Sequence, residues 1–241
     1  MLQSPIRRLA PLAIVLTVFA VACGSDSKPS PPTSSTSSTS TTSTSSSTAA
    51  TTTTTTVPVA ATTIAVWPTA NSAVRYRDPV AATRGFATNL AHFRNPIVGA
   101  FRPGGARSGE VLVRVTARGP VTTVLVRQMG SDNSWWVLGS STPNIVMQAP
   151  AAGATIASPT SLRGTSTAFE ATVNYALNQD DHAAPLKEGI VMGGANGDMG
   201  PYSATVTFPT PASARGSLVM YTISAESGNV AEASVVRVAF T

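Results

Sequence analysis

The hydrophobic and polar positions of this 241-residue chain fall into four successive patterns. An uncharged apolar run covers residues 9–22, and a tract made almost entirely of serine and threonine covers residues 30–56. From residue 64 the apolar residues become periodic, first at helical spacing and later at every second position, as in strands. The chain is therefore expected to fold only after residue 63.

The first periodic segment predicts one helix. Asp78-Pro79 supplies the acidic N-cap and first-turn proline that begin helices, and Asn95-Pro96 is a stop signal. Between these signals the apolar residues recur every three or four positions, at Ala82, Phe86, Leu90 and Phe93. Such a stripe predicts a four-turn helix with one buried face.

Alternating apolar and polar residues follow the helix in three runs, at residues 109–117, 121–128 and 135–139. Glycine-containing turns separate the runs, which is typical of antiparallel strands in a meander. Residues 64–144 are therefore expected to form a small α+β domain, with one helix on three or four strands.

The remaining residues, 145–241, predict a β-sandwich. They contain about seven short alternating runs separated by turn residues, and they lack a cysteine pair. Two of the expected buried faces are Phe169, Ala171, Val173, Tyr175 and Leu177, and Val219, Tyr221 and Ile223. The glycine-rich segment 193–200 is expected to be a hairpin connection that turns at Asn196-Gly197. The fold class is thus mainly β.

This C-terminal segment resembles a known family. Its first strand ends in Ala149-Pro150, a small turn precedes Ser158-Pro159, and its last strands flank the turn Ser227-Gly228-Asn229. In these features it is similar to Gmad2, the immunoglobulin-like domain of bacterial spore germination proteins. The resemblance implies a sandwich that binds or spaces, and it implies no catalytic residues.

The N-terminus predicts export. Arg7 and Arg8 precede the fourteen-residue apolar run, which is too short for a usual membrane-spanning helix and fits a signal peptide over residues 1–22. The sequence Ala-Val-Ala-Cys-Gly-Ser at residues 20–25 resembles a bacterial lipobox. The resemblance implies a diacylglycerol on Cys23, which would attach the protein to a membrane outside the cytoplasm. The alternative is an ordinary secretory signal with an unmodified thiol.

Residues 23–63 are expected to be a disordered tether. Of the 27 residues from Ser30 to Thr56, 23 are serine or threonine. Such a segment has no apolar side chains large enough to offset the entropy lost on ordering. The tether is expected to hold the folded part away from the membrane.

The charges argue against a nucleic-acid partner. The net charge is +5, and it is concentrated in residues 57–149, where nine arginines face three acids, Asp78, Glu110 and Asp132. Residues 150–241 carry four basic residues against seven acids. No run of basic residues and no basic helix is present in the sequence, so the partner is expected to be an envelope protein or an anionic wall polymer.

Four residues of the middle segment form the candidate binding surface. Arg114 and Arg127 lie on neighbouring expected strands and could meet an anionic partner, or they could only keep the sheet soluble. Trp135 and Trp136 are adjacent on one strand and must point to opposite faces. One would join the core, and the other would be a ligand platform or a packing contact.

The sequence offers no catalytic, metal or cofactor motif. Its histidines, His92 and His182, lie in different expected domains, and the sequences Gly-x-Ser-x-Gly and His-Glu-x-x-His are absent. A non-catalytic envelope lipoprotein that binds or scaffolds is therefore the leading hypothesis. The alternative is a hydrolase that modifies the cell wall, with its site between the two domains.

Overall fold

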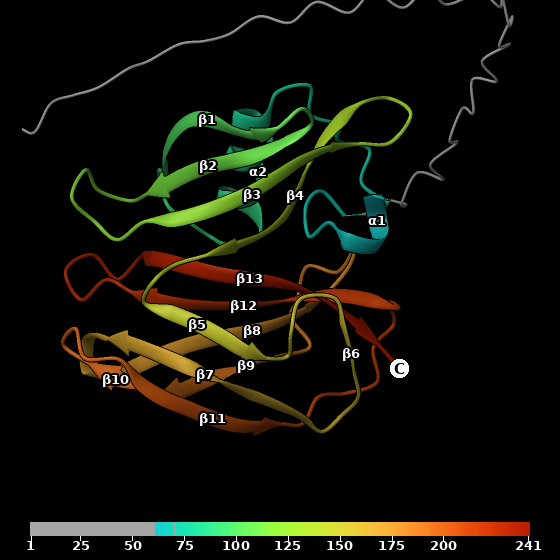
Figure 1. The fold of residues 1–241 in the computed structure, drawn as a ribbon. Coiled ribbons are helices and arrows are strands. Elements are labelled where there is room, and N and C mark those ends of the chain that lie inside the picture. Colours follow the sequence, from blue (N-terminus) through green and yellow to red (C-terminus); the bar gives the residue numbers. More distant parts are fainter. Residues whose placement is uncertain (1–60, 70) are drawn as a thin grey trace, which may run out of the picture. The chain divides into compact units, whose positions relative to one another are not determined.

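The computed structural model describes residues 61–69 and 71–241, so the expected signal peptide, Cys23 and nearly all of the expected tether lie outside the described residues. The described part is mainly β, as the sequence predicts (Figure 1). Its helices are α1 (Ala61–Ile64), α2 (Pro79–Asn89) and the 3-10 segment η1 (Phe169–Ala171). Its strands are β1 (Ile97–Gly105), β2 (Ser108–Arg114), β3 (Thr122–Met129), β4 (Ser134–Ser141), β5 (Ile145–Ala149), β6 (Ala154–Ile156), β7 (Thr160–Ala168), β8 (Thr172–Gln179), β9 (Lys187–Met192), β10 (Gly194–Ala195), β11 (Gly200–Val206), β12 (Arg215–Ile223) and β13 (Val230–Phe240).

Helix α2 begins where the sequence predicts and ends early. The Asp78 carboxylate accepts a hydrogen bond from the Ala81 amide at 2.7 Å, which caps the helix. At the other end the amide of Ala91 bonds to the carbonyl of Phe86, five residues back, and His92 adopts φ 55°. The helix therefore stops at Asn89 and has three turns, so the four-turn prediction is wrong.

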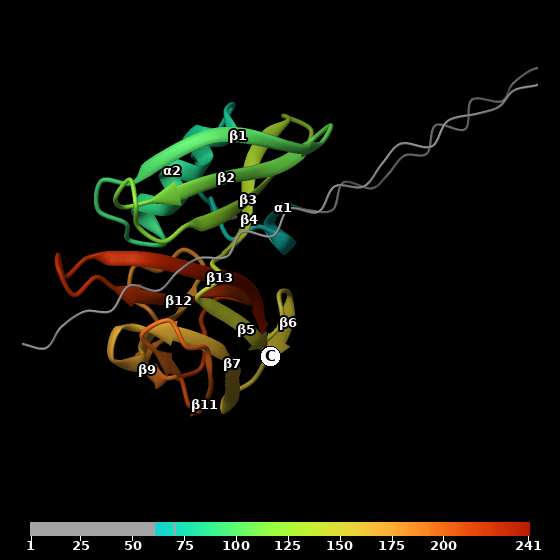
Figure 2. The same cartoon turned by 60° about the vertical axis from the view of Figure 1, so that its left-hand side comes forward.

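Strands β1–β4 form the expected antiparallel meander, and α2 lies along one of its faces (Figures 1 and 2). The apolar stripe of α2 packs on the inward residues of β2, β3 and β4. The buried residues of this contact are Ala82, Phe86, Ala87, Val111, Val113, Val124, Val126 and Val137. The alternation of apolar and polar residues thus predicts correctly which side chains of β2 and β3 face α2.

The C-terminal part is a sandwich of two sheets. One sheet contains β10, β7 and β11, with β5 paired to β7 on its other side. The facing strands are β13, β12, β8 and β9, in that order. The core between the sheets includes Ile145, Leu162, Val173, Tyr175, Leu177, Tyr202, Leu218, Met220 and Val238.

Strands β12 and β13 are buried on both faces, which the sequence does not predict. On β12, Leu218 and Met220 face the sandwich core, whereas Val219 faces the apolar cluster around α2. On β13, Ala233 and Val235 belong to that same cluster. Of the expected buried face, Val219 is buried and Tyr221 half-buried, but both pack against the α2 cluster, and Ile223 is 39% exposed, so its expected burial is wrong.

The two expected domains share one sheet and one apolar cluster across residue 144. Strand β4 pairs with β13 at Ser140 and Val235, and the Ser140 hydroxyl donates to the Ala233 carbonyl at 2.8 Å. A Cβ added at Gly139 would lie 2.5 Å from the Val235 carbonyl oxygen, so this approach needs a glycine. Separate folding of residues 64–144 and 145–241 stays a prediction.

Local expectations in the sandwich have different outcomes. The turn at Asn196-Gly197 is confirmed, because both residues have positive φ, 56° and 96°, and the Asp198 amide bonds to the Ala195 carbonyl. The expected hairpin is wrong, because segment 193–200 connects β9 of one sheet to β11 of the other. The expected burial of Phe169 is wrong, because its side chain is 62% exposed. Glu170 and Ala171 have φ values of 53° and 58°, so the chain turns before β8 begins.

Candidate functional site

Arg114 and Arg127 both lie on the outer face of the meander, opposite the face that packs on α2. Their inward neighbours Val113 and Val126 are fully buried, so alternation directs the arginines outward. Arg127 lies opposite Ser108, six residues before Arg114 on β2. Strand geometry therefore separates them by about 20 Å along the sheet. The two arginines therefore lie at opposite ends of this face and are too far apart to bind the same small group.

Apolar residues lie between the arginines on this outer face. Ile97 is paired with Arg114 and is 50% exposed, and Leu125 on β3 is 42% exposed. A third arginine of this face, Arg102 on β1, is exposed and lies opposite Glu110. The outer face therefore combines three arginines and exposed aliphatic side chains with one acid.

The two tryptophans occupy opposite faces of β4, as the sequence predicts. Trp135 faces the α2 side, where its ring meets Phe101 edge-on with 5.1 Å between centroids. Trp136 faces outward and is only 4% exposed, because Ala65 and Met129 pack against it. Of the two alternatives, the packing contact describes Trp136 in this structure.

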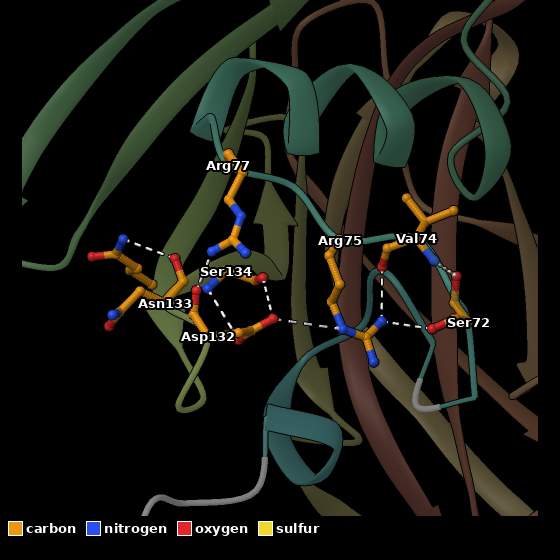
Figure 3. A network of polar contacts seen from close by, with 8 residues as sticks. Ser72, Val74, Arg75, Arg77, Asp132, Asn133 and Ser134 are labelled. Atoms are coloured by element: carbon orange, nitrogen blue, oxygen red, sulfur yellow. Dashed lines mark hydrogen bonds and ion pairs between the residues drawn. The ribbon is translucent and has the colours of Figure 1, made fainter.

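A polar network around Arg75 and Asp132 (Figure 3) holds Arg75 beside the Trp136 ring. The Arg75 guanidinium carbon lies 5.1 Å from the ring centroid, and its Nη1 donates to the carbonyls of Ser72 (2.5 Å) and Val74 (2.8 Å). Its Nε lies 3.9 Å from the Asp132 carboxylate. The cation–π contact and these bonds hold Arg75 against the sheet, so it is less available to a partner than Arg127.

Asp132 is the acceptor at the centre of this network. The Ser134 hydroxyl donates to its carboxylate at 2.5 Å, and this bond, together with the Ser134 amide and the nearby charge of Arg77, lowers the pKa of Asp132. Arg77 also donates to the Asp132 carbonyl. The β3–β4 turn thus keeps a negative charge that neutralises part of the basic segment.

A second candidate site is a cleft of about 260 Å³ that brings both histidines together. It is lined by Val66, Trp67, Thr69, Asn89, Leu90, His92, Asn178, Gln179, Asp180, Asp181, His182, Ala183 and Ser217. The sequence places His92 and His182 in different expected domains. Both line the cleft because the segment around Asp180–His182 lies beside the end of α2, and no local motif in the sequence signals this arrangement.

The acids of this cleft are engaged in structural bonds. Asp180 receives two hydrogen bonds from the buried Arg237 guanidinium, at 2.7 and 2.5 Å. Asp181 accepts from the Asn71 amide at 2.7 Å, and His182 Nδ1 lies 2.9 Å from the Asp180 carbonyl oxygen. Among the hydrogen bonds of the described residues, none joins a histidine of this cleft to a carboxylate.

Within the described residues no metal cluster or membrane-crossing helix was found. No group of three or more His, Cys, Asp and Glu side chains in residues 61–69 and 71–241 could hold a metal ion. No helix in the same ranges is both long and apolar enough to cross a bilayer. Cys23, the expected lipid attachment site, lies outside them.

The architecture defines an immunoglobulin-like β-sandwich whose larger sheet continues into an α+β meander. Residues 144–229 match the family model Gmad2, the immunoglobulin-like domain of bacterial spore germination. The match confirms the resemblance for this part of the chain and stops just before β13. Neither the comparison with curated proteins nor that with solved structures gives a match.

Proposed function

We propose that this protein is a lipid-anchored lipoprotein of the cell envelope that binds or scaffolds without catalysis. The lipobox-like sequence around Cys23 supports the anchor, and the Gmad2 match supports a binding or spacing role for the sandwich. The partner is an anionic wall polymer or an acidic envelope protein.

One observation carries the choice of partner, namely the outer face of the meander. It exposes Arg102 and Arg127 at the surface, with Arg114 half-buried at its far end. Leu125 and Ile97 add apolar contact area between these charges. Such a face can attract a polyanion over a distance and then bury aliphatic surface against it.

The experiment measures retention of the purified folded protein on isolated cell walls at low and high ionic strength. The double variant Arg114→Glu Arg127→Glu is expected to lower retention about tenfold at low salt, because two attractive charges become repulsive. The difference from wild type is expected to shrink at high salt, where the screening length falls to about 3 Å. Equal retention of both proteins at low salt would contradict the proposed face.

The matched control tests the alternative function, a wall-modifying hydrolase. The cleft with His92, His182 and two aspartates is the observation that favours this alternative. The double variant His92→Ala His182→Ala is expected to bind walls and support any cellular phenotype as wild type does, because the cleft acids are held by structural bonds. Loss of the phenotype with folding preserved would favour the hydrolase.

A further inference from the structure

A cavity of about 440 Å³ opens at the end of the sandwich where β7 ends and β13 begins. It lies apart from the outer face of the meander and from the histidine cleft, and it shares no lining residue with that cleft. Its lining is Pro120, Asn144, Thr167, Ala168, Phe169, Asn196, Gly197, Thr222, Ile223, Ser224, Ala225, Ala231 and Glu232. Only Glu232 among these residues carries a charge.

The Glu232 carboxylate is buried and held by neutral donors. The side chain is 4% exposed, and its oxygens accept from the Asn144 amide at 3.1 Å and from the Thr222 hydroxyl at 3.3 Å. The Thr142 hydroxyl donates a further short bond to Oε2. These bonds fix the carboxylate of a residue that lines the cavity, and every donor among them is a neutral side chain.

No basic side chain of the described chain pairs with this carboxylate. In residues 61–69 and 71–241 the ion pairs join Arg75 to Asp132 and Arg237 to Asp180. Buried charges in proteins are usually paired, because an uncompensated charge away from water is costly. Among the described residues, Glu232 is therefore the one acidic residue that lines the cavity and has no basic partner there, in a sandwich that carries more acids than bases.

Two of the residues that line the cavity are apolar and exposed. Phe169 is 62% exposed and Ile223 is 39% exposed, although both were expected in the core. The two left-handed residues Glu170 and Ala171 turn the chain just after Phe169. Left-handed backbone is costly for residues other than glycine, so the fold accepts strain where it presents this ring to solvent.

We propose that the cavity binds a primary ammonium group carried on an aliphatic stem. The ammonium would lie toward Glu232, which attracts it by charge, and the stem would lie along Phe169 and Ile223. The ring face of Phe169 also favours a nearby cation. This chemistry occurs in the lysine side chain of a partner protein and in wall peptides that have an unblocked side-chain amine.

The site is independent of the proposed function. The outer face of the meander selects an anionic partner, whereas this cavity selects a cationic group. Failure of one proposal therefore leaves the other unchanged.

The first experiment titrates the purified folded protein with n-pentylammonium and follows the backbone amides by NMR. The expected result is saturable shifts at Asn196, Ile223 and Ala231, with none of comparable size from the isosteric neutral probe n-pentanol. Equal shifts from both probes, or shifts elsewhere only, would overturn the proposal. A lysine-containing peptide and a soluble wall peptide with an unblocked side-chain amine then distinguish the two sources by their relative affinity.

The second experiment uses three variants. Glu232→Gln keeps the side-chain shape and is expected to weaken n-pentylammonium binding about tenfold, the effect of one lost charge-assisted contact. Phe169→Ala is expected to weaken it about threefold without harming the fold, because the ring is exposed. Ile190→Ala, an equally exposed apolar side chain outside the cavity, is the matched control and should bind as wild type.

The three variants test the ammonium site even if one of them does not fold. If Glu232→Gln does not fold, the comparison of Phe169→Ala with Ile190→Ala still tests the apolar wall. Undiminished binding by Phe169→Ala would then overturn the proposal. If all three variants fold and bind n-pentylammonium equally, the proposal is overturned, and the carboxylate serves only to connect the β4–β5 turn to β12.

Discussion

At the scale of single residues, the sandwich depends on aromatic rings that cover cross-strand glycines. Tyr202 is paired with Gly164, and a Cβ added at this glycine would lie 2.5 Å from the Tyr202 hydroxyl oxygen. Tyr175 covers Gly189 in the same way, again with 2.5 Å to the hydroxyl oxygen. The rings fill the space that a side chain would occupy, so the glycines and tyrosines are coupled in packing.

Tyr202 predicts a specific response to alkaline pH. Burial raises its pKa to about 12 in the folded state, from 10.0. Between these values the unfolded chain releases the phenolic proton and the folded chain retains it, so the free energy of unfolding falls as pH rises. The loss is expected to reach at most about 1.4 kcal/mol per pH unit.

The measurement is urea unfolding at several pH values between 10 and 12, comparing wild type with Tyr202→Phe. The variant should lose this part of the pH dependence at little other cost, because the Tyr202 hydroxyl makes only long contacts of 3.4 Å to the Val146 carbonyl and to the Met220 sulfur. Tyr221→Phe is a comparison variant that should also lose part of the pH dependence, because burial and the nearby charge of Glu188 raise the pKa of Tyr221 as well. The same slope in wild type and Tyr202→Phe would show that this phenol does not govern alkaline stability.

At the scale of secondary-structure elements, β12 and β13 determine how the two parts of the fold depend on each other. A fragment of residues 145–241 retains the core between its own sheets and is expected to unfold cooperatively. It would also expose Val219, Ala233 and Val235, which are buried in the whole chain. Its free energy of unfolding is expected to be lower by about 3 kcal/mol or more, since each buried valine contributes about 1.5–3 kcal/mol.

Chemical denaturation of this fragment, alongside a longer fragment of residues 61–241, checks the expectation. The variant Val219→Thr Val235→Thr should raise the solubility of the shorter fragment and destabilise the longer one. Absence of a cooperative transition in residues 145–241 alone would mean that the sandwich needs the meander to fold.

The same two strands show what the sequence can and cannot predict. Three predicted features depend only on neighbouring residues, and the structure contains all of them. They are the start of α2, the strand alternation in β2 and β3, and the Asn196-Gly197 turn. The inner face of β12 depends on which distant element covers it. Because apolar residues occupy both faces of this strand, alternation alone does not show which face lies in the sandwich core.

In the candidate sites too, the sequence predicts what neighbouring residues determine and does not predict contacts between distant segments. The outward direction of Arg114 and Arg127 comes from local alternation and agrees with the structure. Three other features require contacts between distant segments. They are the cleft lined by both His92 and His182, the burial of Trp136 by Ala65, and the cavity beside Glu232. The sequence has no periodic signal for such contacts.

At the scale of the whole molecule, the proposed anchor predicts where the protein resides. Cys23→Ala is expected to release the protein from the membrane fraction or leave its signal peptide unprocessed, because the thioether-linked lipid has no other attachment site in a chain with one cysteine. Cell fractionation followed by mass spectrometry of the N-terminal peptide measures both effects. Cys23→Ser is a second variant that nearly keeps the size of the side chain and replaces the thiol with a hydroxyl. Processed Cys23→Ala that stays with membranes would contradict the lipid anchor.

The attachment of residues 64–67 to β4 has a mechanical consequence for an anchored protein. The amides of Val66 and Trp67 donate to the Val137 carbonyl at 2.8 and 3.3 Å, and the Val137 amide donates back to the Trp67 carbonyl at 2.8 Å. If the chain is held at Cys23, a pulling force along it reaches this bridge before it reaches α2 or the sandwich. Because Trp136 beside the bridge is packed under Ala65, the load enters at the middle of a central strand. From β4 the load reaches the sandwich through the pairing of β4 with β13 at Ser140 and Val235.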